Sequence, residues 1–505
     1  MNVQNRILSV ILAALLLAPA LCACSPANDP ADGTSTPPAT SSAETTAPAT
    51  ETETEPPETE PVRDTDDLPA ELNGGGYKFR ICSRQRDFFH SSWLTEDTTG
   101  NRLNDALYDR QTNVGKRLNV EFTEELVNDT TVARNSILTF SDDFDLLNTR
   151  CATAWEYAAY PLFFSLDQLK YIDLDKSYWD KNLNDAMTVG GKAYFATGAS
   201  NITAYDFTHA LLFNKDMIAD KNLENPYELV TSGKWTLDKF AEMIDGASDD
   251  LNGDGVMDQT DAYGYLSQPK SVLPCLWIAS GILSIEKDAK DMPVFTLASN
   301  EKFTSLFTRA FAITYDSGDW YQNKSRDNSD PVLLDMFQTD RGLFYATTFF
   351  YIEKLREMET DFGVLPYPKY DETQKNYLSR VEGVELSGVP LTVPDTDLVS
   401  AVIEALASES GKKNGVTDSY YEITLKTQAA RDAESSAMLD LIFANRVFDL
   451  GDTIWCDILR DGVFEKMFLN NDRNLTSNLE SVTGKLNKNI EHTTKGMAKG
   501  VTLGK

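Results

Sequence analysis

The chain has 505 residues, which is long for a single compact core and predicts two domains or one large two-lobed unit. Its 78 acidic residues outnumber the 46 Lys and Arg residues, which gives a formal charge of -32. Such a charge repels nucleic-acid phosphates, so nucleic acid is excluded as a partner.

The N-terminus has the features of an export signal. Arg6 precedes an apolar stretch at 7–17 that is too short for a comfortable membrane span, and we expect a signal peptide over residues 1–23. The sequence "LCAC" at 21–24 resembles the bacterial lipoprotein cleavage box. That resemblance implies that Cys24 carries the acyl chains, palmitate among them, and anchors the protein at the extracellular face of the cytoplasmic membrane. The alternative is an ordinary secretory signal that is cleaved near the same place.

Residues 24–72 are expected to form a disordered stalk. They contain "TSTPPATSSAETTAPATETETEPPETEP" and almost no large apolar side chain, so they cannot bury a core. The four cysteines beyond the stalk are far apart in sequence, and a core of this size does not need disulfides. We expect them to be buried free thiols: Cys82, Cys151, Cys275 and Cys456.

The folded part begins with alternating strands and helices. "YKFRICSR" at 77–84 predicts a strand, a helix follows at 101–118, and "NVEFTEEL" predicts the next strand. A helix at 130–139 and a strand at 144–150 continue the pattern. This alternation predicts a mostly parallel sheet with crossover helices.

The second half has the same character without a detectable repeat. "AYFATGAS" and "HALLFNKDMI" suggest strands, and Thr236 can cap a helix that ends near Ile244. "RGLFYATTFFYIEKL" and "FGVLPYPKY" are apolar strand or helix candidates. Residues 397–468 are expected to be largely helical.

An acidic loop at 249–265, "DDLNGDGVMDQTDAYGY", has the spacing of a twelve-residue calcium loop. Gly255 fits the sharp turn, and the expected ligands are Asp250, Asn252, Asp254, the carbonyl of Val256, Asp258 and Asp261. "AYGYLSQ" after the loop does not suggest a second helix, so a sensor role is disfavoured. A structural Ca²⁺ is our expectation, and an empty acidic turn is the alternative.

Several segments together resemble the carbohydrate-associated, family 1-like extracellular solute-binding proteins of bacterial ABC importers. They are the lipoprotein box with its stalk, "LLFNKDMI" at 211–218, "NPYELVTSGKWTLDKFAEMI" at 225–244 and "FGVLPYPK" at 362–369. The resemblance extends over residues 77–470. Around Gly342 the sequence matches the family pattern only loosely.

The resemblance implies an α/β fold of the type II periplasmic-binding-protein kind, with a hinge between two lobes that are each a mostly parallel sheet flanked by helices. Ligand would bind in the interlobe cleft and shift the hinge equilibrium toward closure. The closed form would deliver a mono- or oligosaccharide to membrane permease subunits. The implied division is an N-terminal lobe at 73–205 plus 343–396, a C-terminal lobe at 206–342 plus 397–470, and a tail or helix at 471–505.

A sugar presents apolar faces and hydroxyl edges, so its site needs aromatic platforms and polar side chains. In an open α/β sheet such side chains follow the carboxyl ends of the strands. By this rule and the family pattern, the candidate contacts are Arg84, Phe88, Trp93, Arg150, Trp155, Tyr157, Tyr205, Asp206, Trp277, Trp320, Phe349 and Phe350. For each tryptophan, packing in a core is the alternative role.

The sequence lacks the common enzyme signatures. It has only His90, His209 and His492 as histidines, and no HExxH, GxSxG, phosphate loop or CxxC pair. We therefore expect no enzyme and no catalytic cofactor. Two alternatives remain: a glycan-binding adhesin or sensory receptor on the same fold, and a surface glycosidase, which needs only two carboxylates.

Overall fold

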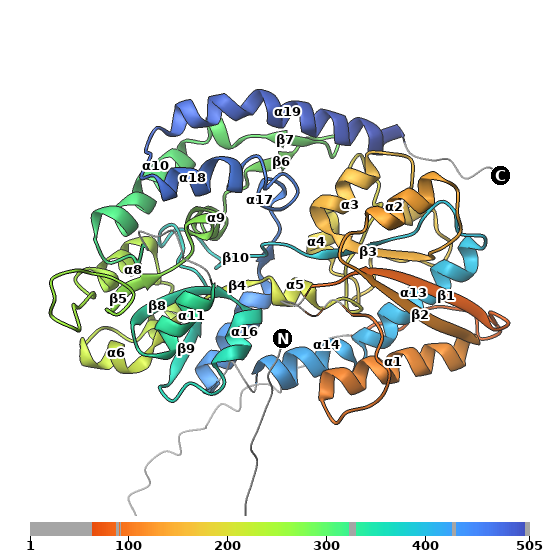
Figure 1. The fold of residues 1–505 in the computed structure, drawn as a ribbon, viewed down its shortest axis with the longest axis horizontal. Coiled ribbons are helices and arrows are strands. Elements are labelled where there is room, and N and C mark those ends of the chain that lie inside the picture. The colour runs from red at the N-terminus through yellow and green to blue at the C-terminus, as the bar shows by residue number, and fades with distance from the viewer. Residues whose placement is uncertain (1–62, 87–89, 91, 323–329, 427–430, 500–505) are drawn as a thin grey trace, which may run out of the picture. The chain divides into compact units, whose positions relative to one another are not determined.

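The computed structural model describes residues 63–86, 90, 92–322, 330–426 and 431–499. The expected signal peptide, Cys24, most of the expected stalk and Phe88 lie outside these residues. The described part contains two four-stranded sheets, each with its own layer of helices (Figure 1). We call each sheet with its helices a lobe.

The first sheet has the strand order β11-β3-β1-β2. β1 pairs in parallel with β2 and β3, and β11 is antiparallel to β3. The strands are β1 Tyr77–Arg84, β2 Val120–Val127, β3 Leu146–Arg150 and β11 Glu385–Gly388. The helices of this lobe are α1 Arg102–Leu118, α2 Thr131–Leu138, α3 Cys151–Ala158, α4 Lys181–Met187 and α13 Thr396–Gly411. α1 starts where the Asn101 side chain accepts a hydrogen bond from the backbone of Asn104, which satisfies one orphan amide.

The second sheet has the order β5-β8-β4-β9. β5 and β8 are parallel, and β4 runs antiparallel to both β8 and β9. The strands are β4 His209–Asn214, β5 Tyr263–Leu266, β8 Gly342–Thr348 and β9 Phe362–Leu365. Around them lie α6 Lys215–Asp220, α7 Pro226–Thr231, α8 Leu237–Ile244, α9 Pro269–Ala279, α10 Glu301–Phe311, α11 Asp330–Gln338, α12 Phe349–Ile352, α16 Ala433–Ala444 and α18 Glu465–Leu469. A hairpin of β6 Ile285–Lys287 and β7 Pro293–Phe295 contacts the first lobe, because Ile285 packs in the core that contains α3 and Lys287 donates to the carbonyl of Thr188.

Three chain segments lie next to one another between the two sheets. The first is α5, Thr203–Asp206, with the residues that follow it, and Thr208 bridges to Val381 of the second segment. β10, Ser379–Arg380, in the second segment pairs in parallel with β12, Arg446–Val447, in the third. These paired crossings form the hinge region between the lobes.

The last helix, α19 Leu475–Lys499, contacts both lobes (Figure 1). Leu479 packs in the hydrophobic core of the second lobe. Leu486 and Ile490 pack in a core that contains α3 and other first-lobe residues. The expected "tail or helix" after residue 470 is therefore a helix that packs on both lobes.

The fold class is confirmed, because each sheet has three strands in one direction and one in the other. The limits of the lobes differ from those expected. β8 and β9 belong to the second sheet although residues 343–396 were expected in the first lobe. α13 packs against α1 and lies in the first lobe, whereas residues 397–470 were expected in the second. Both errors arise because an apolar strand or helix fits either lobe, and only its pairing partners decide.

The expected stalk also ends earlier than residue 72. Asp66 forms an ion pair with Arg117 of α1, and Leu68 and Leu72 pack against the first-lobe core. Cys82, Cys151, Cys275 and Cys456 are buried free thiols, as predicted. In the described part of the chain, no helix has the length and apolar character needed to cross a bilayer.

Candidate functional site

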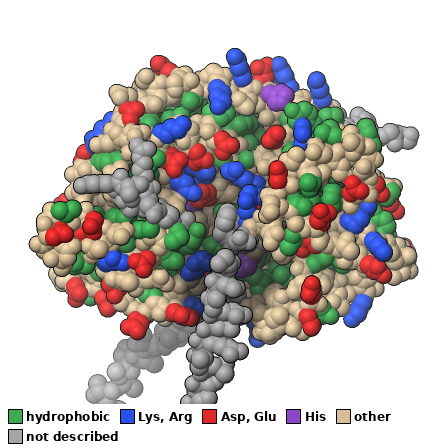
Figure 2. Space-filling model, in the orientation of Figure 1, with side chains coloured by type: hydrophobic (Ala, Val, Ile, Leu, Met, Phe, Trp, Pro, Cys, Tyr) green, Lys and Arg blue, Asp and Glu red, His purple; other side chains and the backbone are tan. Residues whose placement is uncertain are grey.

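The candidate site lies where the carboxyl ends of strands from both sheets meet the crossing segments. The chain after β1 reaches the first crossing through His90, and the chain after β5 reaches the second crossing through Lys270. Figure 2 shows Lys and Arg side chains gathered in the hollow at the centre of the viewed face. Ligands bind at this edge of open α/β sheets, because loops there converge on one place.

His90 of the first lobe joins the lobes at this point. Its Nδ1 lies 3.1 Å from Oδ1 of Asp206 in α5, and its Nε2 lies 4.0 Å from Oε2 of Glu353, which follows α12. The His90 ring also packs edge-on against Phe350 and Tyr420. Burial opposes the charge, but the neighbouring Asp206 carboxylate raises the pKa of His90 to about 9. His90 is therefore protonated at neutral pH and pairs with Asp206.

Two cavities flank the first crossing. The first-lobe cavity has a volume of about 240 Å³, and the residues that line it include Arg86, His90, Trp93, Leu103, Ser200 and Asn201. The second-lobe cavity has a volume of about 250 Å³, and its lining includes His209, Gln268, Lys270, Thr347, Phe350 and Glu382. Each cavity combines an aromatic ring with polar groups, which suits a ligand that has both apolar faces and hydroxyl edges.

A buried ionic network supports the second-lobe cavity. Glu382 of the second crossing lies 3.3 Å from Nζ of Lys270 and 2.9 Å from Nε2 of His209. Burial opposes its charge, but Lys270 and Arg380 hold the pKa of Glu382 well below its usual range. Glu382 therefore stays ionised and can accept a hydrogen bond from a ligand.

The first-lobe edge of the hollow is rich in arginine. Nη1 of Arg84, at the end of β1, lies 3.1 Å from Oε1 of Glu385 at the start of β11. Nη2 of Arg150, at the end of β3, donates to Sγ of Cys456 at 2.9 Å. Oε2 of Glu385 is buried without a hydrogen-bond partner among the described residues, and burial raises the pKa of Glu385 to about 7.

The structure places the expected ligand contacts in three groups. Arg84, Trp93, Arg150, Asp206 and Phe350 lie at the crossing segments or line the two cavities. Tyr205 lines a separate cavity of about 520 Å³ beside Trp179 and Arg446. The other described candidates are buried in the hydrophobic cores, which is the alternative role expected for the tryptophans: Trp155, Tyr157, Trp277, Trp320 and Phe349. Trp155, for example, packs against Trp455 with ring centroids 5.5 Å apart.

Several residues of the site were not expected from the sequence. His90, Lys270, Glu353 and Glu382 carry no local motif, and their roles depend on contacts between distant segments. His90 could have been suspected, since it follows the first strand in the loop that was already expected to face the cleft. Nothing in the sequence around Glu382 distinguishes it among the 78 acidic residues of the chain.

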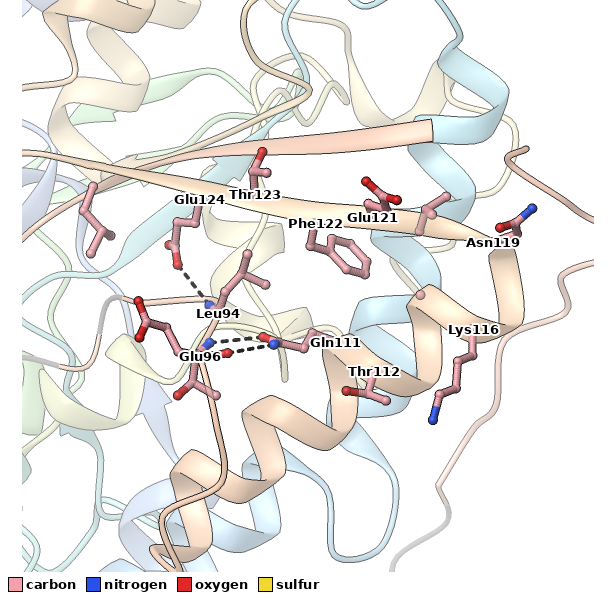
Figure 3. Close-up of a pocket in the computed structure, with 14 residues that line it drawn as sticks. Leu94, Glu96, Gln111, Thr112, Lys116, Asn119, Glu121, Phe122, Thr123 and Glu124 are labelled. Atoms are coloured by element: carbon pink, nitrogen blue, oxygen red, sulfur yellow. Dashed lines mark hydrogen bonds between the residues drawn. The ribbon is translucent and has the colours of Figure 1, made fainter. Parts of the chain in front are cut away.

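A larger groove of about 920 Å³ lies elsewhere, along edge strand β2 (Figure 3). Two of its polar side chains, Glu124 and Gln111, are already used by the chain itself. Glu124 accepts hydrogen bonds from the backbone amides of Trp93 and Leu94, and Gln111 pairs with the backbone of Thr95. Its volume alone therefore does not make it the candidate site.

The acidic loop lies between α8 and β5. Asp250 accepts hydrogen bonds from the amides of Gly253 and Gly255, at 2.7 and 2.8 Å. Asp261 accepts from the amides of Leu251 and Asp258. Gly253 and Gly255 have φ values of 72° and 78°, which favour glycine at these turns. The oxygen-rich side chains fit the ligand preference of Ca²⁺.

Comparison with solved structures shows the fold. An ABC substrate-binding protein of Listeria monocytogenes in complex with cycloalternan is similar with a TM-score of 0.54 and 14% identity, over 82% of this chain and 99% of that one. A cyclo/maltodextrin-binding protein complexed with maltotetraose gives a TM-score of 0.56 and 13% identity, over 83% and 98%. A family 1 extracellular solute-binding protein of Bifidobacterium longum subsp. infantis gives 0.54 and 14%, over 82% and 100%.

No protein-family model and no curated protein matches the sequence. At these low identities the structural likeness establishes the architecture alone. The chain has the two-lobed, type II fold of the sugar-binding proteins with which it was compared.

Proposed function

We propose that the protein is the substrate-binding component of an ABC importer and captures a mono- or oligosaccharide between its lobes. One observation carries this proposal: cavities from both lobes flank the same crossing segment, where His90 of the first lobe contacts Glu353 of the second. A ligand in this place touches both lobes only when they are close together, so it stabilises the closed arrangement. The similar proteins bound to cycloalternan and maltotetraose support carbohydrate as the ligand class.

The proposal includes a lipid anchor at Cys24 and delivery of the ligand to permease subunits at the extracellular face of the membrane. It also includes a structural Ca²⁺ held by the loop at 250–261. The support for the anchor and the export signal comes from the sequence alone. The oxygen-rich loop supports the ion, which would fasten the connection between α8 and β5.

The test is a thermal-shift screen of the full soluble chain against mono- and oligosaccharides, followed by calorimetry on every hit. We expect one class of saccharide to raise Tm and to bind without turnover. Phe350→Ala should weaken that binding, because Phe350 lines the second-lobe cavity. Phe140→Ala is the matched control, since Phe140 is 88% exposed on the first lobe. Equal loss of affinity in both variants would contradict the placement of the site.

The other outcomes separate the alternatives. Release of smaller sugars by the purified protein would favour a surface glycosidase. Binding without turnover in a protein whose gene lies apart from any permease genes would favour an adhesin or a sensory receptor. If no carbohydrate in the panel binds, the proposed function fails.

A further inference from the structure

The first-lobe cavity is lined by cations, hydrogen-bond donors and apolar groups. The polar residues of its described lining are Gln85, Arg86, His90, Ser92, Ser200 and Asn201, together with the indole N–H of Trp93. None of the described lining residues is Asp or Glu, although the chain contains 78 of them. Asp87, in the same loop, lies outside the described residues.

Two of the donors in this lining are buried and unused. Nε1 of Trp93 and Oγ of Ser200 have no hydrogen-bond partner within the described part of the chain. Both residues are more than nine-tenths buried. A buried donor without a partner costs on the order of 1–3 kcal/mol, so an acceptor on a ligand would remove this cost.

A buried positive charge lies next to two residues that line this cavity, Trp93 and Ser200. Arg110 of α1 is 1% exposed, and its guanidinium donates to the backbone carbonyls of Ser200, at 3.0 Å, and Trp93. It forms no ion pair with a carboxylate of the described residues, and Glu124 acts on it only at longer range. Burial lowers the pKa of Arg110 to about 10, so the group stays charged at neutral pH. Buried charges in proteins are usually paired, and among the described residues this one has no carboxylate in direct contact.

The charges around the cavity add to this imbalance. Arg86 lines the cavity and, in the part of the chain that the structure describes, pairs with no carboxylate. Burial lowers the pKa of Arg84, and the charges of Arg86 and Arg150 lower it further, so three guanidinium groups lie at this edge. Two of the acidic groups nearby have cationic partners: Asp206 pairs with His90, and Glu385 with Arg84. Glu124 accepts hydrogen bonds from the amides of Trp93 and Leu94, and Asp129 interacts with Arg86 at longer range.

We propose that the first-lobe cavity binds an anionic group of the ligand, so that the protein takes a charged carbohydrate such as a uronate or a sugar phosphate. Arg86 would face the anion, with Trp93 and Ser200 donating hydrogen bonds to its oxygens. The positive charge of Arg110, which is buried next to Trp93 and Ser200, also favours a negative charge in the cavity. Charge-assisted hydrogen bonds of this kind are stronger than neutral ones, so they would separate charged sugars from neutral ones. This inference rests on the proposed function and specifies the ligand class.

The test compares matched sugars by calorimetry with the full soluble chain. The probes are glucuronate, glucose 6-phosphate and glucose, then galacturonate and galactose, and the disaccharides digalacturonate and galactobiose. We expect an anionic probe to bind at least about tenfold more tightly than its neutral partner, with an affinity that falls as salt is added. The uronate and phosphate arms tell the two sources of negative charge apart.

Two variants locate the effect. Arg86→Gln should weaken the anionic probe about tenfold or more and leave the neutral partner nearly unchanged. Trp93→Phe keeps an aromatic ring at this position but removes the indole N–H, so it should also weaken the binding of the anionic probe. Arg356→Gln is the matched control, because Arg356 is exposed and its pair is with the adjacent Glu357.

A neutral sugar that binds as tightly as its anionic partner would overturn this inference and leave the proposed function intact. The same holds if Arg86→Gln weakens both probes equally. If no probe binds and no sugar in the wider screen binds, both the inference and the proposed function fail.

Discussion

Arg380 and Asp452 form a fully buried, two-point ion pair at the hinge. Nε of Arg380 lies 2.6 Å from Oδ2 of Asp452, and Nη2 lies 2.9 Å from Oδ1. Arg380 is in the second crossing, whereas Asp452 is in α17, Leu450–Thr453, which follows the third. The pair therefore fixes two crossing segments relative to each other.

Asp452→Asn should lower the free energy of unfolding by about 3–5 kcal/mol, because it removes the two-point partner of the buried Arg380 and leaves only the Glu382 carboxylate, at 3.8 Å, to balance its charge. Urea unfolding measures the change. Asp397→Asn breaks the exposed pair with Lys170 and should cost less than about 1 kcal/mol. Similar losses in both variants would show that the buried pair has no special role.

The His90 contact predicts a dependence of stability on pH. The folded pKa of about 9 lies above the usual value of 6.5, so the stabilisation is complete below pH 6.5 and is lost as the pH rises through 9. Urea midpoints of the wild type and His90→Gln should therefore converge between these two values. A difference that stays constant across this range would argue against a protonated His90.

The calcium proposal predicts a shift in Tm. Millimolar Ca²⁺ should raise Tm relative to chelator, because an ion that binds only the folded loop stabilises it. Asp250→Asn should abolish the shift. Asp238→Asn, at an exposed position on α8, should keep it. Saccharide binding should survive chelation, since the loop lines neither cavity.

A variant of Trp155 can distinguish a packing role from a role in ligand contact. Trp155→Ala should cost about 3–5 kcal/mol of stability because it removes a buried ring that packs on Trp455. The affinity of the folded fraction for a saccharide should stay close to that of the wild type. A selective loss of affinity with little loss of stability would return Trp155 to the site.

The sequence predicted local structure better than long-range contacts. β1 was predicted at 77–84 and is found there, and Thr236 caps α8 as expected, with its hydroxyl accepting from the amide of Lys239. These features depend on neighbours within a few residues, so the sequence contains the information. The strand expected at "AYFATGAS" is an exception. Ala196 makes only an isolated bridge to Ser387 and belongs to no regular strand.

The candidate site was predicted only in part for the same reason. Arg84 lies at the end of β1 and Trp93 in the loop after it. They could be predicted because the alternation of strands and helices in the sequence shows where β1 ends. The choice between a core tryptophan and a cleft tryptophan depends on what packs over the ring. The sequence left both roles open for Trp155 and Trp277, and the structure buries both in the hydrophobic cores. Arg380 and Asp452 are 72 positions apart, and no spacing rule joins them.

The final helix has a consequence for how ligand binding can be detected. α19 has 25 residues and a length of about 37 Å, and each end packs in a different lobe. Opening of the hinge must therefore bend the helix or loosen one of its ends. Amide exchange near Leu486 and Ile490 should slow when ligand binds, although the described cavities contain no residue of this segment. The C-terminus would then act as a reporter of lobe motion at a distance from the bound sugar.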